Sequence, residues 1–163
     1  MKDREHIPNL NFKSPAPWIA TWFELGLIRP APGTWGSLGA FPFGIIAFQL
    51  GGYSFFLPLI LLITALGLWA SQKFEEETQT HDNRSIVVDE VAGQLIAMLP
   101  AANNPILLIL SFLFFRLFDV KKPWPISVID QKMPGAWGVM GDDLVAGCMA
   151  ALCVVGLRYA GFG

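Results

Sequence analysis

The sequence predicts an all-α fold: a small membrane-embedded bundle of about five short, partly kinked helices, with an interfacial helix before it. Hydrophobic residues form 53% of the 163 residues and charged residues only 15%, and the mean hydropathy is +0.49. An ordinary soluble domain has about 25% charged residues. Three long stretches carry no charge at all, at 30–72, 91–115 and 144–157. Because so few charges cannot cover a water-facing surface, we expect lipid to surround much of the chain.

The chain is expected to form one domain, 1–163, that begins with a polar arm over 1–16. The arm has no apolar core or small-residue cleavage site, so it is not a signal peptide. An amphipathic helix is predicted over 17–28, because apolar residues recur there at spacings of three and four. These residues are Trp18, Ile19, Trp22, Phe23 and Leu27. Such a helix either lies in the lipid headgroup region or packs on the rest of the domain.

The bundle itself is predicted over 32–161. Gly, Pro and Asn residues divide it into five apolar runs, at 38–50, 53–70, 86–99, 106–118 and 144–159. Most runs are shorter than the ~20 residues of a perpendicular span, so tilted or incomplete spans remain open. Pro42 and Pro58 lie inside the first two runs and predict kinks.

The order of the runs predicts which segments share a side of the membrane. If all five cross, the segments 1–37, 71–85 and 119–143 lie on one side. Of the 11 Lys and Arg residues, Arg158 alone then lies on the other side. The positive-inside rule places the long segments in the cytoplasm, which predicts a multi-pass protein.

Three acidic clusters stand at the borders of the uncharged runs and fall on that cytoplasmic side: Asp89-Glu90, Asp119 and Asp142-Asp143. The first pair begins the third run, and the last precedes the fifth, with Asp142 as a possible N-cap. Stabilisation of a helix start therefore explains these two pairs as well as function does. Asp119 follows the fourth run, where a negative charge opposes the helix dipole. Capping does not explain it, so function is favoured.

These clusters predict a Mg²⁺ site, because hard divalent cations bind oxygen ligands. The chain has no Cys or His cluster for zinc, and Cys148 and Cys153 are interpreted as small core residues. His81-Asp82 is interpreted as a solvated loop pair. The net charge of −2 offers no basic stripe for a nucleic acid.

Basic residues next to Asp119 predict a phosphate ligand. Arg116 lies one helical turn before Asp119, and Lys122 is followed by the stiff segment Pro123-Trp124-Pro125-Ile126. Snorkelling at the membrane border is the alternative for Lys122 and its neighbour Lys121.

A Gly-rich turn is predicted at Pro32-Gly33-Thr34-Trp35-Gly36-Ser37-Leu38, where backbone N–H groups could hold an anion. It lacks the Gly-Lys-Ser/Thr ending of a P-loop, so no nucleotide is expected. In isolation Ser37 is interpreted as an N-cap.

Taken together, these segments resemble the phosphatidylglycerophosphatase A family of bacterial membrane enzymes from about Pro17 onward. The residues that carry the resemblance are Pro32-Gly33-Thr34, Gly36-Ser37-Leu38, His81-Asp82, Asp89-Glu90 with Gly93, Arg116 with Asp119, Lys122-Pro123-Trp124-Pro125-Ile126, and Asp142-Asp143 with Ala146-Gly147. The chain departs from the family at Glu24-Leu25-Gly26, where members tend to have a Gly-Ser-Gly-like stretch.

The resemblance implies Mg²⁺-dependent hydrolysis of the terminal phosphomonoester of phosphatidylglycerophosphate at the bacterial inner membrane, in phosphatidylglycerol synthesis. We expect the metal on Asp89, Glu90, Asp119 and Asp143, with Asp142 assisting. The expected catalytic set is Asp89, Glu90, Asp119, Lys122 and Asp143. The expected phosphate-binding set is Thr34, Ser37, Arg116 and Lys122.

Several alternatives remain open at this point. Water attacks the phosphorus directly, or Asp119 acts as the nucleophile and forms an acyl-phosphate. The substrate is another phosphomonoester lipid, or the chain is a small membrane cation-binding or transport protein. A scaffold whose acidic residues are only caps is a further reading. The oligomeric state does not follow from the sequence.

Overall fold

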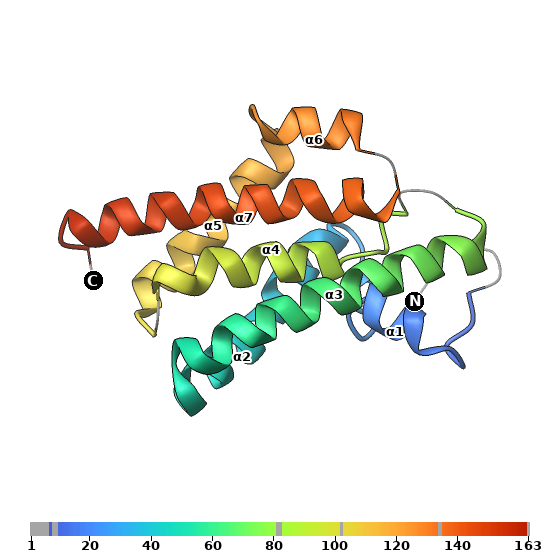
Figure 1. Cartoon of the computed structure of the whole chain (residues 1–163), viewed down its shortest axis with the longest axis horizontal. Helices are drawn as coiled ribbons and strands as arrows, with labels where there is room; N and C mark the ends of the chain where they lie inside the picture. Colours follow the sequence, from blue (N-terminus) through green and yellow to red (C-terminus); the bar gives the residue numbers. More distant parts are fainter. Residues whose placement is uncertain (1–6, 8–9, 81–82, 102, 134, 163) are drawn as a thin grey trace.

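In the part of the chain that the computed structural model describes, residues 7, 10–80, 83–101, 103–133 and 135–162, every regular element is helical (Figure 1). The α-helices are α1 Pro15–Ala20, α2 Pro32–Gly51, α3 Tyr53–Thr78, α4 Val88–Met98, α5 Pro105–Lys121, α6 Ile126–Lys132 and α7 Ala136–Tyr159. Two short 3₁₀ helices span Leu25–Leu27 and Leu99–Ala101. The predicted all-α class is confirmed, with more helices than expected.

The five long helices α2, α3, α4, α5 and α7 correspond to the five predicted runs and alternate in direction (Figure 1). One end of the bundle therefore gathers the starts of α2, α4 and α7 with the ends of α3 and α5. The ends of α2 and α4 and the starts of α3 and α5 lie at the opposite end. The predicted grouping of segments at two ends is confirmed.

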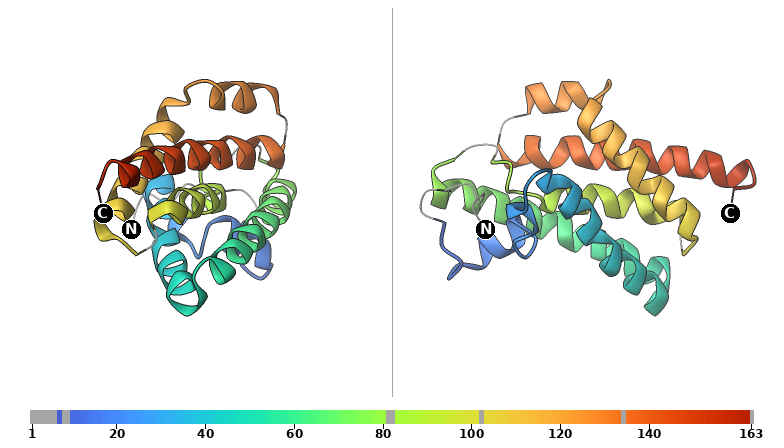
Figure 2. Two further views of the ribbon diagram at one scale, coloured as in Figure 1. Left: turned by 60° about the vertical axis from the view of Figure 1, so that its left-hand side comes forward. Right: turned by 180° about the vertical axis from the view of Figure 1, so that it is seen from behind.

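Helix α4 is the centre of the packing and contacts α2, α3, α5 and α7 (Figure 2). Glycines allow α4 and α7 to approach closely. A Cβ atom on Gly147 would lie 2.3 Å from the carbonyl oxygen of Gly93, and one on Gly93 would lie 2.5 Å from that of Asp143. Real Cβ atoms do not approach this closely, so these positions require glycine. The close contact brings the start of α4 beside the second turn of α7.

The continuous helix predicted over 17–28 is wrong. Helix α1 ends at Ala20, and Trp22, Phe23 and Glu24 then have φ values of 45°, 56° and 68°, which a right-handed helix excludes. The Trp22 side chain is buried, and its Nε1 donates a hydrogen bond to the Gly39 carbonyl at 3.2 Å. Packing on the bundle therefore decides the path of this segment. Of the arm predicted over 1–16, residues 1–6 and 8–9 lie outside the described residues.

Two helices begin earlier than predicted. Helix α2 begins at Pro32, a favourable first position, so the Gly-rich segment forms its first turns instead of a separate turn. Its N-cap is Ala31, so Ser37 is no cap. Helix α7 begins at Ala136, which places Asp142 inside the helix and excludes its N-cap role. In both cases polar residues lie within the first turns of the helix, so the predicted apolar run covers only part of the helix.

Helices α3 and α7 are long and apolar enough to cross a membrane. Only 33% of the most apolar window of α3 is buried inside the molecule. Large apolar side chains face outward on several helices, among them Leu50, Leu61 and Ile106, which are 70%, 71% and 61% exposed. These features support membrane association. The five crossings remain a prediction.

Candidate active site

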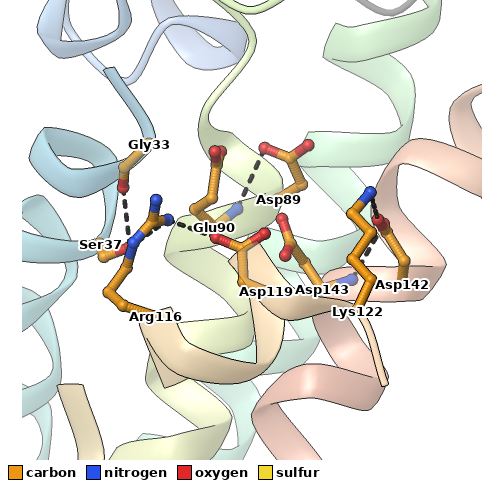
Figure 3. A network of polar contacts seen from close by, with 9 residues as sticks. All are labelled: Gly33, Ser37, Asp89, Glu90, Arg116, Asp119, Lys122, Asp142 and Asp143. Carbon is orange, nitrogen blue, oxygen red and sulfur yellow. Dashed lines mark hydrogen bonds and ion pairs between the residues drawn. The ribbon is translucent and has the colours of Figure 1, made fainter. Parts of the chain in front are cut away.

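A pocket of about 320 Å³ opens at the end of the bundle where the acidic clusters meet. Helices α2, α4, α5, α6 and α7 all contribute to its wall, together with the loop before α4. The predicted charged site residues all line it: Asp89, Glu90, Arg116, Asp119, Lys122, Asp142 and Asp143 (Figure 3). Residues up to 54 positions apart in the chain thus share one cavity, as the topology predicted.

Three carboxylates in this pocket lie close together. Asp89 and Glu90 stand in the first turn of α4, and Asp143 comes from α7; one oxygen of each lies within 4.8 Å of the others. Glu90 Oε2 and Asp143 Oδ1 are buried and have no hydrogen-bond partner among the described residues. Such buried polar atoms are rare, and a bound ion or an ordered water would satisfy them. The three carboxylates could therefore hold a metal ion.

Burial disfavours charge on this cluster. Asp89 is buried, and the Glu90 N–H donates a 3.0 Å hydrogen bond to Asp89 Oδ1. Glu90 follows it in the first turn of α4, so the charges of the two carboxylates repel each other. No Lys or Arg within the described chain forms a salt bridge with either carboxylate. A cation would compensate both the burial and the mutual repulsion.

Asp119 differs because it is already paired. Arg116 Nη1 donates to Asp119 Oδ2, and the two side chains are 19% and 14% exposed. The predicted Arg116–Asp119 partnership is confirmed. Arg116 also approaches Ser37 Oγ at 3.5 Å, and this hydroxyl donates to the Gly33 carbonyl at 2.8 Å (Figure 3). Ser37 thus supports Arg116 from α2 and does not itself line the pocket.

Lys122 is held between two carboxylates. It ends α5 in the left-handed region at φ 44°, and its Nζ donates to Asp142 Oδ2 at 2.7 Å and to Asp130 of α6. Burial lowers the pKa of Lys122, but the hydrogen bonds with Asp130 and Asp142 outweigh this and raise it. Asp130 was not predicted. The sequence indicates only that Asp130 falls in the segment 119–143, which the predicted topology places on the same side as the acidic clusters.

Gly33 contacts the site so closely that a side chain there would displace the charged groups of the site. A Cβ atom there would lie 2.2 Å from Glu90 Oε1 and 3.0 Å from Arg116 Nη1. Thr34, the next residue, does not line the pocket, so its role as a phosphate ligand stays a prediction without support from the geometry. Arg84 lines the pocket and was not predicted. His81-Asp82 lies outside the described residues.

The sequence is similar to known proteins over most of its length. A family model described as phosphatidylglycerophosphatase A matches residues 18–158. The chain is 36% identical over 161 residues to "Phosphatidylglycerophosphatase A" of Haemophilus influenzae, with 98% of both chains covered. It is 34% identical over 148 residues to the protein of that name from Escherichia coli, covering 89% of this chain and 86% of the relative.

A third relative carries a different name. The "Putative phosphatidylinositol-3-phosphatase" of Bacteroides thetaiotaomicron is 32% identical over 148 residues, covering 86% of this chain and 92% of the relative. No solved structure matches the chain.

Proposed function

The chain belongs to the phosphatidylglycerophosphatase A family and is a phosphatase, and on this premise we propose that it hydrolyses the terminal phosphomonoester of phosphatidylglycerophosphate. The products are phosphatidylglycerol and inorganic phosphate. One observation carries the proposal: a single pocket joins an arginine and a lysine to three close carboxylates that form no salt bridge within the described chain. A metal site beside basic residues suits a phosphomonoester, because both compensate the negative charge of the phosphate and of the leaving oxygen.

Mg²⁺ is the proposed metal, on Asp89, Glu90 and Asp143. The donors are all oxygen atoms, which Mg²⁺ prefers, and two of them are buried without a partner. Asp119 and Asp142 border this set, and their pairing with Arg116 and Lys122 gives them a second role in placing the bases. When bound, Mg²⁺ would neutralise the phosphate and the charge that develops on the leaving oxygen.

The basic residues bind and orient the phosphate in this proposal. Arg116 and Lys122 have further N–H groups besides those that contact carboxylates, and these can donate to the nonbridging oxygens. Water attacks the phosphorus, a bond forms between them, and the bond from phosphorus to the lipid glycerol oxygen breaks. The attacking water gives up one proton and the leaving oxygen takes one up, so the step balances. Attack by Asp119 is less well supported, because one of its oxygens already accepts from Arg116.

We place the enzyme in the bacterial inner membrane as a multi-pass protein, with its pocket on the cytoplasmic side and a role in phosphatidylglycerol synthesis. Two apolar helices of sufficient length support membrane association. The acidic clusters gather at the end that holds the Lys and Arg residues of the described chain other than Arg158, and this supports the orientation.

A second candidate substrate is a phosphoinositide monoester, favoured by the name of the Bacteroides relative. It shares the same chemistry, a phosphomonoester on a membrane lipid, so the same pocket residues would serve it.

The deciding experiment measures phosphate release by the purified, detergent-solubilised chain. Its substrates are phosphatidylglycerophosphate, phosphatidylinositol 3-phosphate and phosphatidic acid, each with Mg²⁺ or with EDTA. We expect Mg²⁺-dependent turnover with a preference for phosphatidylglycerophosphate. Equal turnover in EDTA would contradict the metal, and a preference for the phosphoinositide would replace the proposed substrate.

A variant ties this activity to the pocket. Asp119→Asn should abolish most turnover, while Glu76→Gln, a matched change at an exposed pair on α3, should leave it intact. Near-normal turnover of folded Asp119→Asn would contradict the site. Hydrolysis of phosphatidylglycerophosphate with an isotopically chiral terminal phosphate distinguishes the two nucleophiles, because direct attack by water inverts the configuration at phosphorus and two successive displacements retain it.

A further inference from the structure

The pocket meets the exposed apolar surface on one side. Among the large hydrophobic side chains that are exposed in the described chain, two line the pocket: Val120 on α5 and Met133 at the end of α6. They are 67% and 42% exposed. Both belong to the α5–α6 side, whereas no described residue of α3, another apolar helix with an outward face, lines the pocket. Apolar surface and phosphate pocket are therefore continuous at α5 and α6.

Helix α5 extends this contact into a long stripe. Its outward apolar residues follow spacings of three and four: Ile106, Ile109, Leu113, Leu117 and Val120. They are 48–67% exposed, and α5 lies on the outside of the bundle (Figure 2, right). Such spacing places them on one helical face. We call these five residues the α5 stripe; it runs the length of the helix and ends at the pocket.

The segment that follows the pocket end of the α5 stripe has the composition of a membrane interface. Trp124 and Trp137 are 78% and 64% exposed, and Lys121 and Lys132 are exposed near them in the sequence. Trp is enriched where lipid tails meet headgroups, and Lys favours anionic headgroups. The pocket mouth thus lies at the level expected for a lipid phosphate, with the stripe on the tail side.

We propose that the acyl chains of the lipid substrate lie along the α5 stripe, so that the substrate reaches the pocket sideways from the bilayer, past Val120 and Met133. This rests on the proposed function, which supplies a lipid phosphomonoester as the ligand. Tails on the stripe and a phosphate at the carboxylates place one lipid molecule across one continuous surface. The exposed row on α3, which includes Leu61 and Leu62, has no such connection.

Photocrosslinking tests the position of the tails directly. Phosphatidylglycerophosphate with a diazirine in one acyl chain is irradiated with the full-length chain in vesicles of phosphatidylethanolamine and phosphatidylglycerol. Labelled peptides are identified by mass spectrometry. We expect labelling of 106–124 that excess unlabelled phosphatidylglycerophosphate abolishes, and labelling of α3 that it does not change. Equal competition at both helices, or at neither, would overturn the proposal.

A kinetic test separates this proposal from the proposed function. Leu117→Asn should raise KM for long-chain phosphatidylglycerophosphate about tenfold with little change in kcat, and leave kcat/KM for the deacylated, water-soluble analogue within about twofold. Leu61→Asn on α3 is the matched control and should change neither. If wild type hydrolyses neither compound, the proposed function fails. If Leu117→Asn and Leu61→Asn have equal effects, only the α5 stripe fails.

Discussion

The carboxylates of the pocket fall into two groups that share a chemistry but not an environment. Asp89, Glu90 and Asp143 lie within 4.8 Å of one another, with no described basic partner for Asp89 or Glu90 and with buried, unsatisfied oxygens on Glu90 and Asp143. Asp119 and Asp142 are each bonded to a base, Arg116 and Lys122. In the first group the carboxylates repel one another. In the second group the positive charge of Arg116 or Lys122 compensates each carboxylate.

This difference indicates a division of labour. A buried charge without a counter-charge is unfavourable unless a ligand compensates it, so the first group is suited to a cation. The paired group fixes where the bases point, which determines where a phosphate is held. The following variants should separate the two groups.

The largest effect is expected from the unpaired group. Glu90→Gln and Asp143→Asn should each lower kcat/KM on the order of 10²–10³-fold, because they remove charge from the proposed metal site. The metal-free variants should be at least as stable as wild type, because a repulsive charge is gone. Phosphate release and thermal unfolding in EDTA check this. Unfolding at a clearly lower temperature would assign these residues a structural role instead.

The next largest effect is expected at Gly33, which lies against Glu90 of the unpaired group. Gly33→Ala should lower activity on the order of 10- to 100-fold, because its Cβ atom would displace the Glu90 carboxylate and the Arg116 guanidinium. Gly156→Ala on α7 is the control, since a Cβ atom there meets open space. That variant should keep full activity and gain up to about 1 kcal/mol of stability from helix propensity. Equal activity of both variants would contradict the packing at Gly33.

The smallest effect is expected from the paired group at its exposed edge. Asp130→Asn leaves Lys122 its bond to the buried Asp142, and the Lys122 and Asp130 side chains are 35% and 40% exposed. Solvent screens such a pair, which is worth below about 1 kcal/mol, so kcat/KM should fall less than about fivefold. Lys122→Gln should have the larger effect, because Asp142 would then be buried unpaired. The reverse order would assign Asp130 the main role.

Much of this site could be predicted from sequence. The sequence predicts a functional role for Asp119, because the C-terminal end of a helix disfavours an acidic residue. It also predicts the pairing with Arg116, because Arg116 lies one helical turn before Asp119. Alternating runs placed the other acidic pairs at the same end. The sequence is less accurate for Thr34 and Ser37, which do not line the pocket. Its Gly-rich segment predicts a turn, whereas the structure has the start of α2 there.

Hydrophobicity and chain order suffice to predict the all-helical class, the alternation of the five long helices and the end at which the charges gather. One turn of spacing also predicts Arg116 with Asp119, but the pairing of Lys122 with Asp142 and the grouping of Asp89, Glu90 and Asp143 appear only when the helices are packed together. This packing depends on contacts a few ångströms long, such as Gly93 against Gly147 and Gly33 against Glu90. The tertiary structure also decided the break in the N-terminal helix and the role of Asp130, because both arise from packing between distant segments.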